Sequence, residues 1–177
     1  MKPIGRRLLV PAIAILILGT FAAGTSFARS QEVGTPRARS QEAGTRYPAA
    51  VHAGTCDNFD LVPLYLLTSP TVPTGNFVGP DEATTAARSR SVIPVPLEKL
   101  LTEDHVIVVR GSDDEPGSPA STSVACGEIG GLRRGEGALV IGLREANESF
   151  FAGISGVLPN PDNSAETVVT VYVFEWA

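Results

Sequence analysis

The sequence predicts an all-β fold, an antiparallel Greek-key sandwich or barrel, over residues 47–177. Short apolar stretches recur along this region, and proline, glycine, asparagine and aspartate separate them, which is typical of strands joined by turns. The region is also long enough to bury one hydrophobic core. Such a pattern favours strands packed in an antiparallel sandwich or barrel. The four clearest predicted strands are residues 106–109, 138–143, 150–157 and 168–174.

The segments between these strands are rich in residues that interrupt strands. An apolar run over 61–67 is followed by a loop with three prolines, and "VLPNPDNS" predicts a turn before the last strand. Pro94 and Pro96 lack an amide donor, so residues 91–97 are at best an edge strand. "PLEKLLTED" predicts one helical turn with its leucines packed against the core.

The last predicted strand carries three aromatic residues at alternating positions. Tyr172, Phe174 and Trp176 therefore lie on one face of it. Aromatic residues are common on the packed side of strands. We expect this face to be part of the core rather than a ligand platform.

Residues 1–28 have the layout of a secretory signal peptide. A basic start containing Arg6 and Arg7 precedes an apolar stretch over residues 8–18, and small residues precede a cleavage site after Ala28. The apolar stretch is short for a membrane span. We expect cleavage, no membrane span in the mature protein, and an extracytoplasmic location, secreted or in the cell envelope. The alternative is that the segment is kept as an N-terminal anchor.

Residues 29–46 predict a disordered tether. "ARSQEVGT" at 28–35 and "ARSQEAGT" at 38–45 are near-copies, and neither has an apolar face. Cleavage of the signal would remove three basic residues and leave 11 basic residues against 19 acidic ones. Such an acidic chain is not expected to bind nucleic acid.

Cys56 and Cys126 are the only cysteines, and they lie 70 residues apart. An even count in an oxidising compartment favours one intramolecular disulfide. Closing a loop of this size would stabilise the fold by about 4 kcal/mol in the chain-entropy model. The alternative is a pair of free, buried thiols.

Two segments resemble copper–zinc superoxide dismutases. "HVIVVRGSDD…VACGEIGG" (105–131) is similar to a dismutase strand ending Val-Val-His, a loop with paired aspartates, and the segment Ala-Cys-Gly-x-Ile. "AAVHAGTC" (49–56) resembles the family's His-x-His stretch and a nearby cysteine. The resemblance implies a dismutase-like β fold in which Cys56 and Cys126 form the family's intrachain bridge. A vaguer similarity to chordin-type domains implies related strands without a defined enzymatic activity.

The order of these segments differs from the dismutase order. About 45 residues follow the Ala-Cys-Gly segment, whereas a dismutase ends soon after it and has additional strands ahead of its His-x-His stretch. We therefore expect a circular permutant, in which residues 138–143, 150–157 and 168–176 take the places of those first strands. Neighbouring termini make such a rearrangement sterically plausible.

Most of the family's metal ligands are missing. Dismutases bind copper and zinc mainly through imidazoles, and this chain has two histidines. His52 matches one ligand, whereas Ala50 and Arg110 stand where two other histidines are expected. A guanidinium has no lone pair to donate, and Ser123 replaces the arginine that guides substrate in the family. We therefore expect no catalytic residues, no cofactor and no dismutase activity.

The remaining polar residues have simpler interpretations. Asp113, Asp114 and Glu115 could bind calcium, but their spacing favours a solvated loop. His52 and His105 could form a weak copper site, but structural roles are favoured for both.

The sequence thus predicts an exported, non-catalytic, dismutase-like β-sandwich with a binding or structural role and an unidentified extracytoplasmic partner. Arg110 is expected to lie at the surface or to pin a loop. The alternative is an extracytoplasmic protein that binds copper or another metal with His52.

Overall fold

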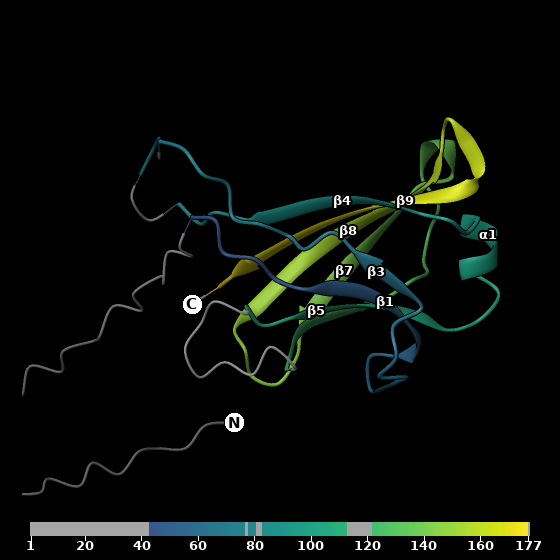
Figure 1. Cartoon of the computed structure of the whole chain (residues 1–177), viewed down its shortest axis with the longest axis horizontal. Coiled ribbons are helices and arrows are strands. Elements are labelled where there is room, and N and C mark those ends of the chain that lie inside the picture. The colour runs from purple at the N-terminus through teal and green to yellow at the C-terminus, as the bar shows by residue number, and fades with distance from the viewer. Residues whose placement is uncertain (1–42, 77, 81–82, 113–121, 177) are drawn as a thin grey trace, which may run out of the picture. The chain divides into compact units, whose positions relative to one another are not determined.

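The computed structural model describes residues 43–76, 78–80, 83–112 and 122–176, and most of their regular structure is β (Figure 1). The predicted signal peptide, most of the tether, and Asp113, Asp114 and Glu115 lie outside the described residues. In chain order the elements are β1 (Ala49–Thr55), β2 (Asn58–Phe59), β3 (Tyr65–Leu67), β4 (Ala87–Ile93), α1 (Leu97–Leu100), β5 (His105–Arg110), β6 (Ser123–Glu128), the 3-10 turn η1 (Gly135–Gly137), β7 (Leu139–Glu145), β8 (Phe151–Asn160) and β9 (Asn163–Glu175).

The strands form one antiparallel sheet that curls into a half-barrel. Their order is β2-β1-β5-β6-β7-β8-β9-β4, and β3 also pairs with β1. Thr71 bridges both Arg46 and Arg88, and the Thr68 N–H donates to Ser91 Oγ at 2.8 Å. These bonds bring β3 beside β4, so the two ends of the sheet approach each other. The structure confirms the predicted antiparallel all-β class.

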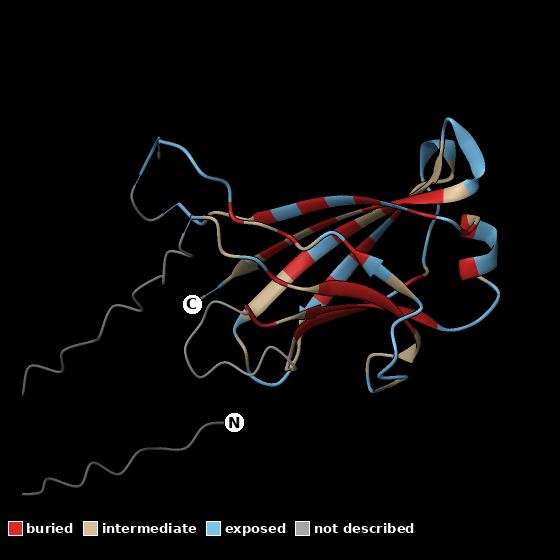
Figure 2. Ribbon diagram, in the orientation of Figure 1, coloured by how far each residue is buried: buried red, intermediate tan, exposed pale blue. Residues whose placement is uncertain are grey.

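The main core lies inside the curl and follows the two-residue period of the strands. Along β4, Ala87, Ser89, Ser91 and Ile93 are buried while the residues between them are exposed (Figure 2). Valine and leucine from the other strands fill the same interior. Each such side chain, when fully buried, stabilises the fold by about 1.5–3 kcal/mol, so this interior is the principal source of stability.

The predicted helical turn and its packing are confirmed. In α1, Leu97 and Leu100 are buried, and Leu101 packs against the core. The preceding strand lies earlier than predicted: β4 ends at Ile93. The following residue, Pro94, has no amide donor with which to continue the ladder.

The last hairpin is longer than the sequence predicted. β8 continues through Pro159, which pairs with Thr167, and β9 starts at Asn163. The turn is therefore tighter than "VLPNPDNS" indicated. A register shift between Pro159 and Asn160 accommodates a residue that cannot donate a ladder hydrogen bond.

A second, smaller core lies on the outer side of the sheet. Val106, Val108 and Cys126 are buried there, and Cys56 and Phe59 pack against them. The hairpin of β1 and β2 thus covers a region of the outer face. It explains why β5 is buried on both sides, with all of its residues except Arg110 buried. The residues that resemble a dismutase site lie around this covered region.

Candidate functional site

His52 lies on the outer face of β1, beneath the β1–β2 hairpin. Its side chain is buried, and its Nδ1 atom is 2.7 Å from the carbonyl oxygen of Asp60. Since a carbonyl only accepts, Nδ1 carries a proton, and in the neutral imidazole Nε2 then carries the lone pair. The Phe59 ring meets the imidazole edge-on, with centroids 5.1 Å apart. Nε2 is buried and has no hydrogen-bond partner among the described residues.

The surroundings of His52 do not form a recognisable metal centre. Among residues 43–76, 78–80, 83–112 and 122–176, no three His, Cys, Asp or Glu side chains are grouped to hold a metal ion. Ala50 lies two residues away on the same face of β1. Arg110 is half-buried at the end of β5, pairs with Ser123, and donates its backbone N–H to the Pro48 carbonyl at 2.7 Å. His52 therefore offers one nitrogen, and the described residues do not complete a group of three such ligands around it.

The two histidines do not converge. His105 pairs with Ala53, the neighbour of His52, so the two side chains lie on opposite faces of the sheet. The Nδ1 atom of His105 is 3.0 Å from the Leu100 carbonyl oxygen and 3.1 Å from that of Glu103. This imidazole fastens the end of α1 to the start of β5.

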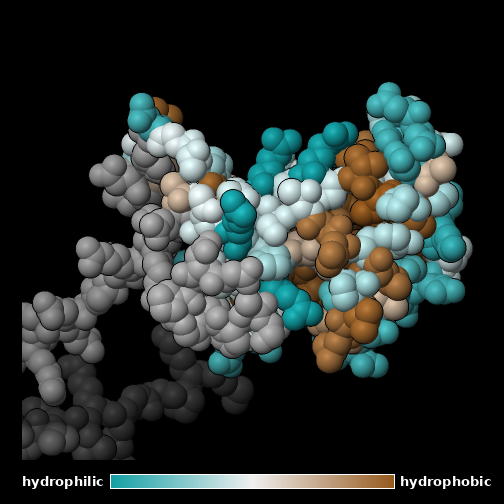
Figure 3. All heavy atoms as spheres, in the orientation of Figure 1, coloured by the Kyte–Doolittle hydropathy of each residue, from teal (hydrophilic) through white to brown (hydrophobic). Residues whose placement is uncertain are grey.

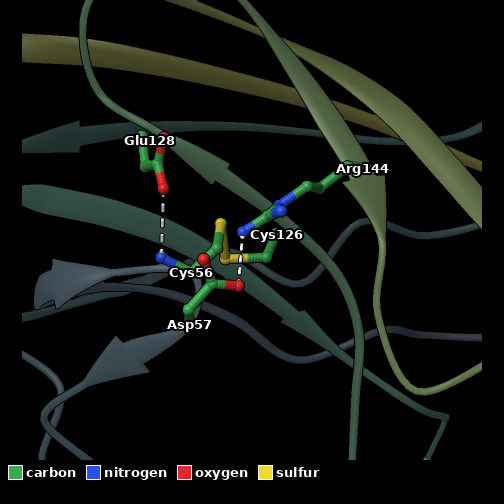
Figure 4. A network of polar contacts seen from close by, with 5 residues as sticks. All are labelled: Cys56, Asp57, Cys126, Glu128 and Arg144. Atoms are coloured by element: carbon green, nitrogen blue, oxygen red, sulfur yellow. Dashed lines mark hydrogen bonds and ion pairs between the residues drawn. A yellow bond between two sulfur atoms is a disulfide. The ribbon is translucent and has the colours of Figure 1, made fainter.

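The predicted disulfide is present and lies in a polar network (Figure 4). Cys56, after β1, is bonded to Cys126 in β6, with Cα atoms 5.8 Å apart. Beside it, Arg144 Nη2 donates to Asp57 Oδ1 at 2.8 Å, and the Cys56 N–H donates to Glu128 Oε1 at 3.4 Å. These contacts hold the β1–β2 hairpin over the small outer core. The segment "VACGEIGG" is thus a structural anchor.

The prediction that the aromatic residues of the last strand belong to the core is wrong. Tyr172 and Phe174 are half-buried and Trp176, just after β9, is 49% exposed, whereas Val171 and Val173 are fully buried. Both sets are apolar and alternate, so the pattern predicts two faces without showing which one points inward. The valines fill the interior of the curl, and the aromatic side chains are left on the outside.

The outer surface of β4, β9, β8 and β7 is here named the aromatic face. Ile154 lies opposite Tyr172 in the register, and Ala152 lies opposite Phe174. At the end of the pair of strands the Trp176 N–H donates to the Phe150 carbonyl at 2.8 Å, and the two rings are 6.2 Å apart. Apolar side chains therefore run in two adjacent columns along this face.

Arginines border the aromatic face on both sides. Arg88 and Arg90 project outward from β4 and are exposed. The Arg88 guanidinium lies 5.6 Å from the centre of the Tyr172 ring, within the range of a cation–π contact. Arg144 on β7 lies on the opposite side and is paired with Asp57. The face thus combines exposed rings with planar cations.

The turn between β7 and β8 holds Phe150 in an unusual backbone conformation. Asn147, Glu148 and Phe150 have φ values of 56°, 54° and 62°, in the left-handed region that few side-chain-bearing residues adopt. The Phe150 N–H donates to Glu145 Oε1 at 2.7 Å, and Ser149 Oγ donates to the Val124 carbonyl at 2.6 Å. These bonds hold a strained turn that places Phe150 beside Trp176.

A second exposed apolar area lies on β3 and the segment before it. Leu61, Val62, Leu64 and Leu66 are 76%, 70%, 49% and 78% exposed. Figure 3 shows apolar atoms gathered on this side of the molecule. We name these four residues the leucine patch. The patch was not predicted, because an apolar run in a sequence ordinarily indicates burial.

No family model, curated protein or solved structure matches this chain. The structure itself defines the class, an antiparallel all-β half-barrel that is compatible with a β-barrel or sandwich fold and carries one disulfide. Within the described residues, no helix has the length and apolar character needed to cross a membrane.

Proposed function

We propose that this chain is an exported, non-catalytic binding domain whose contact surface is the aromatic face. The observation that carries the proposal is the exposure of Phe150, Ile154 and Trp176 on a face whose β4 edge carries the exposed Arg88 and Arg90. Aromatic and arginine side chains are enriched where proteins bind partners. Exposed apolar surface bordered by polar groups commonly marks such a site.

A non-catalytic role is supported by what the candidate residues do. The His105 ring is hydrogen-bonded to backbone carbonyls, and the buried His52 ring packs against Phe59. Arg110 stands where the dismutase resemblance places a metal ligand, and a guanidinium cannot coordinate a metal. The network around Cys126 serves to attach the hairpin.

Export is supported by the Cys56–Cys126 disulfide, because disulfides persist mainly in oxidising compartments. The signal-like layout of residues 1–28 points the same way. The mature domain would then meet its ligand outside the cytoplasm.

We further propose that the half-barrel is a circularly permuted dismutase-like fold. The strands that carry "AAVHAGTC" and "VACGEIGG" both flank β5 in the sheet, and the disulfide joins them. β7, β8 and β9 continue the same sheet from β6 as far as β4. This supports the expectation that they replace the strands missing from the start of the domain.

Sedimentation with envelope material tests the binding role. The full chain, purified with its disulfide intact, is mixed with insoluble cell-envelope material of the source organism. We expect wild type to co-sediment and the variants Trp176→Ala and Ile154→Ser to bind about tenfold more weakly, a loss of about 1.4 kcal/mol. Leu66→Ser serves as the control, because Leu66 is also apolar and is even more exposed but lies in the leucine patch. Equal binding by all four proteins, or none by wild type, would contradict the proposal.

One observation favours a second function, metal binding through His52. Its Nε2 atom is buried and without a hydrogen-bond partner in the described residues, while a backbone carbonyl orients the ring as in many metal-ligating histidines. Dialysis against copper or zinc, followed by metal analysis, tests this function. Stoichiometric metal that resists mild chelation and disappears in His52→Gln would support it, and metal-free protein would refute it.

A further inference from the structure

We propose that the ligand of the aromatic face is an acidic polysaccharide, a chain of sugar rings that carry carboxylate groups. This inference rests on the proposed function, because it specifies what the aromatic face binds. Three features of the face support it: the exposed rings, the open space above two glycines, and the arginines on β4.

The first feature is the aromatic column. Side chains two residues apart on one strand are spaced about 7 Å along it, so Phe174 and Trp176 form a continuous apolar strip with Phe150 beside them. The face of a sugar ring presents C–H groups, which pack against the electron-rich face of an aromatic ring. The exposed surface of Trp176 and Phe150 is the part of the strip best placed for such stacking.

The second feature is the space above Gly142 and Gly156. A Cβ atom built on either residue meets nothing within 4 Å, and neither residue has the positive φ that calls for glycine. At Gly153, by contrast, an added Cβ would collide with the carbonyl oxygen of Tyr172. Gly142 and Gly156 are thus required neither by backbone conformation nor by packing. Gly142 lies opposite Ile154 on β7 and Gly156 lies two residues beyond Ile154 on β8, so they leave a shallow bare area next to Ile154, where a ring can approach the sheet.

The third feature is the charge of the rim. Arg88 and Arg90 are exposed neighbours on one side of β4, and no carboxylate of the described residues forms an ion pair with either one. The chain as a whole has a net charge of −5, so two neighbouring arginines make this edge locally positive on a negatively charged protein. A guanidinium fork matches the two oxygens of a carboxylate. Arg144, on the other rim, is already engaged by Asp57.

The density of charge favours a polysaccharide over a nucleic acid. Nucleic-acid affinity comes largely from many phosphate contacts. This face offers only two arginines that lack a carboxylate partner among the described residues, and the protein has a net negative charge. A uronic acid polymer has a lower charge density and a flat apolar ring in each residue. Its chemistry therefore fits a few cations set beside aromatic rings.

Trp176 provides a direct readout, because it is the only tryptophan of the chain. The disulfide-bonded full chain is titrated with polygalacturonate, with dextran and with single-stranded DNA while tryptophan emission is recorded. We expect polygalacturonate to change the emission and dextran and DNA to have weak effects or none. Added salt should weaken the polygalacturonate response, because the rim arginines are exposed.

Three variants separate the features. Arg88→Gln combined with Arg90→Gln is expected to weaken polygalacturonate binding about tenfold or more, since both charge-assisted hydrogen-bond donors to the carboxylates are lost. Arg134→Gln is the matched control, because Arg134 is exposed and lies outside the face. Gly156→Val is expected to weaken binding by filling the bare area while leaving the unfolding midpoint unchanged.

Several outcomes would overturn the inference. If dextran bound as tightly as polygalacturonate, the arginines would not be recognising carboxylate groups. If DNA bound more tightly than polygalacturonate, the ligand would be a nucleic acid. If Arg134→Gln and the double variant lost the same amount of polygalacturonate affinity, net charge alone would explain the binding and the position of Arg88 and Arg90 would not matter. If no polymer changes the emission although Trp176→Ala still weakens sedimentation with envelope material, the ligand class is wrong and the proposed function stands. If both experiments fail, the proposed function fails as well.

Discussion

At the scale of single residues, two glycines of β8 differ in what surrounds them. Gly153 is buried, and a Cβ added there would collide with the carbonyl oxygen of Tyr172; at Gly156 an added Cβ meets open space. We expect Gly153→Ala to lower the free energy of unfolding by about 1–3 kcal/mol, through overpacking against backbone. Gly156→Ala should change it by less than about 1 kcal/mol. Urea denaturation of both variants measures the difference, and equal effects would contradict the close approach at Gly153.

A second residue-scale prediction concerns the ion pair between Glu98 in α1 and Arg133. Nη1 and Nη2 of Arg133 donate to Oε1 and Oε2 of Glu98, each at 2.6 Å. This hydrogen bonding lowers the pKa of Glu98 below its usual 4.5. A carboxyl whose folded-state pKa is lowered stabilises the fold above its unfolded-state pKa, and the effect is lost as pH falls through the lowered value.

Glu98→Gln should therefore lower the thermal midpoint slightly at pH 7 and should lower it less near pH 2, because the protonated fraction of the carboxyl grows as pH falls through the lowered pKa. The effect is expected to be small, because both side chains are exposed. Thermal unfolding of wild type and variant at the two pH values tests this. A difference of the same size in acid would show that the pair is not its source.

Some residue roles were predictable and others were not. The disulfide could be predicted from an even cysteine count together with a signal-like start of the sequence. The carbonyl partner of His52 could not be predicted, because Asp60 reaches it only when the β1–β2 hairpin folds back over the sheet. The same fold-back buries Val106 and Val108 on the outer face.

At the scale of elements, neighbouring leucines of β3 point in opposite directions. Leu67 is 8% exposed and faces the core, whereas Leu66 is 78% exposed. Leu67→Ala should cost about 2–5 kcal/mol of stability, because it removes buried apolar volume. Leu66→Ala should change stability by no more than about 0.5 kcal/mol. Chemical denaturation compares them, and a large cost at Leu66 would mean that the patch is covered.

The positions of the strands in the sequence were largely predictable, but which side of a strand points toward the core was not. Short apolar stretches between turn residues indicated β5, β7, β8 and β9. In β9 both faces are apolar, and the two-residue period therefore could not assign Val171 or Tyr172 to the interior. The interior prefers the valines because the curl of the sheet leaves limited volume on its concave side.

At the scale of the whole molecule, the antiparallel all-β class was predicted from the length of the apolar stretches and from the turn-forming residues that separate them. The closure of the half-barrel was not, since it depends on Thr71 bridging Arg46 and Arg88, which lie far apart in the sequence. The candidate binding surface also emerges only at this scale. It combines four strands whose outward residues carry no common motif.

The disulfide connects all these scales, because it joins the β1–β2 hairpin to β6 across 70 residues of sequence. Replacing both cysteines with alanine removes the constraint on the unfolded chain, and we expect the free energy of unfolding to fall by about 4 kcal/mol. The hairpin should also protect Val106 and Val108 less well, because it is then held mainly by Phe59 and by polar contacts at its edge. Urea denaturation of wild type and of the double variant, with and without reductant, tests this. Reductant should bring wild type to the stability of the double variant and leave the double variant unchanged. An unchanged midpoint in the double variant would mean that the network of Asp57, Glu128 and Arg144 alone holds the hairpin in place.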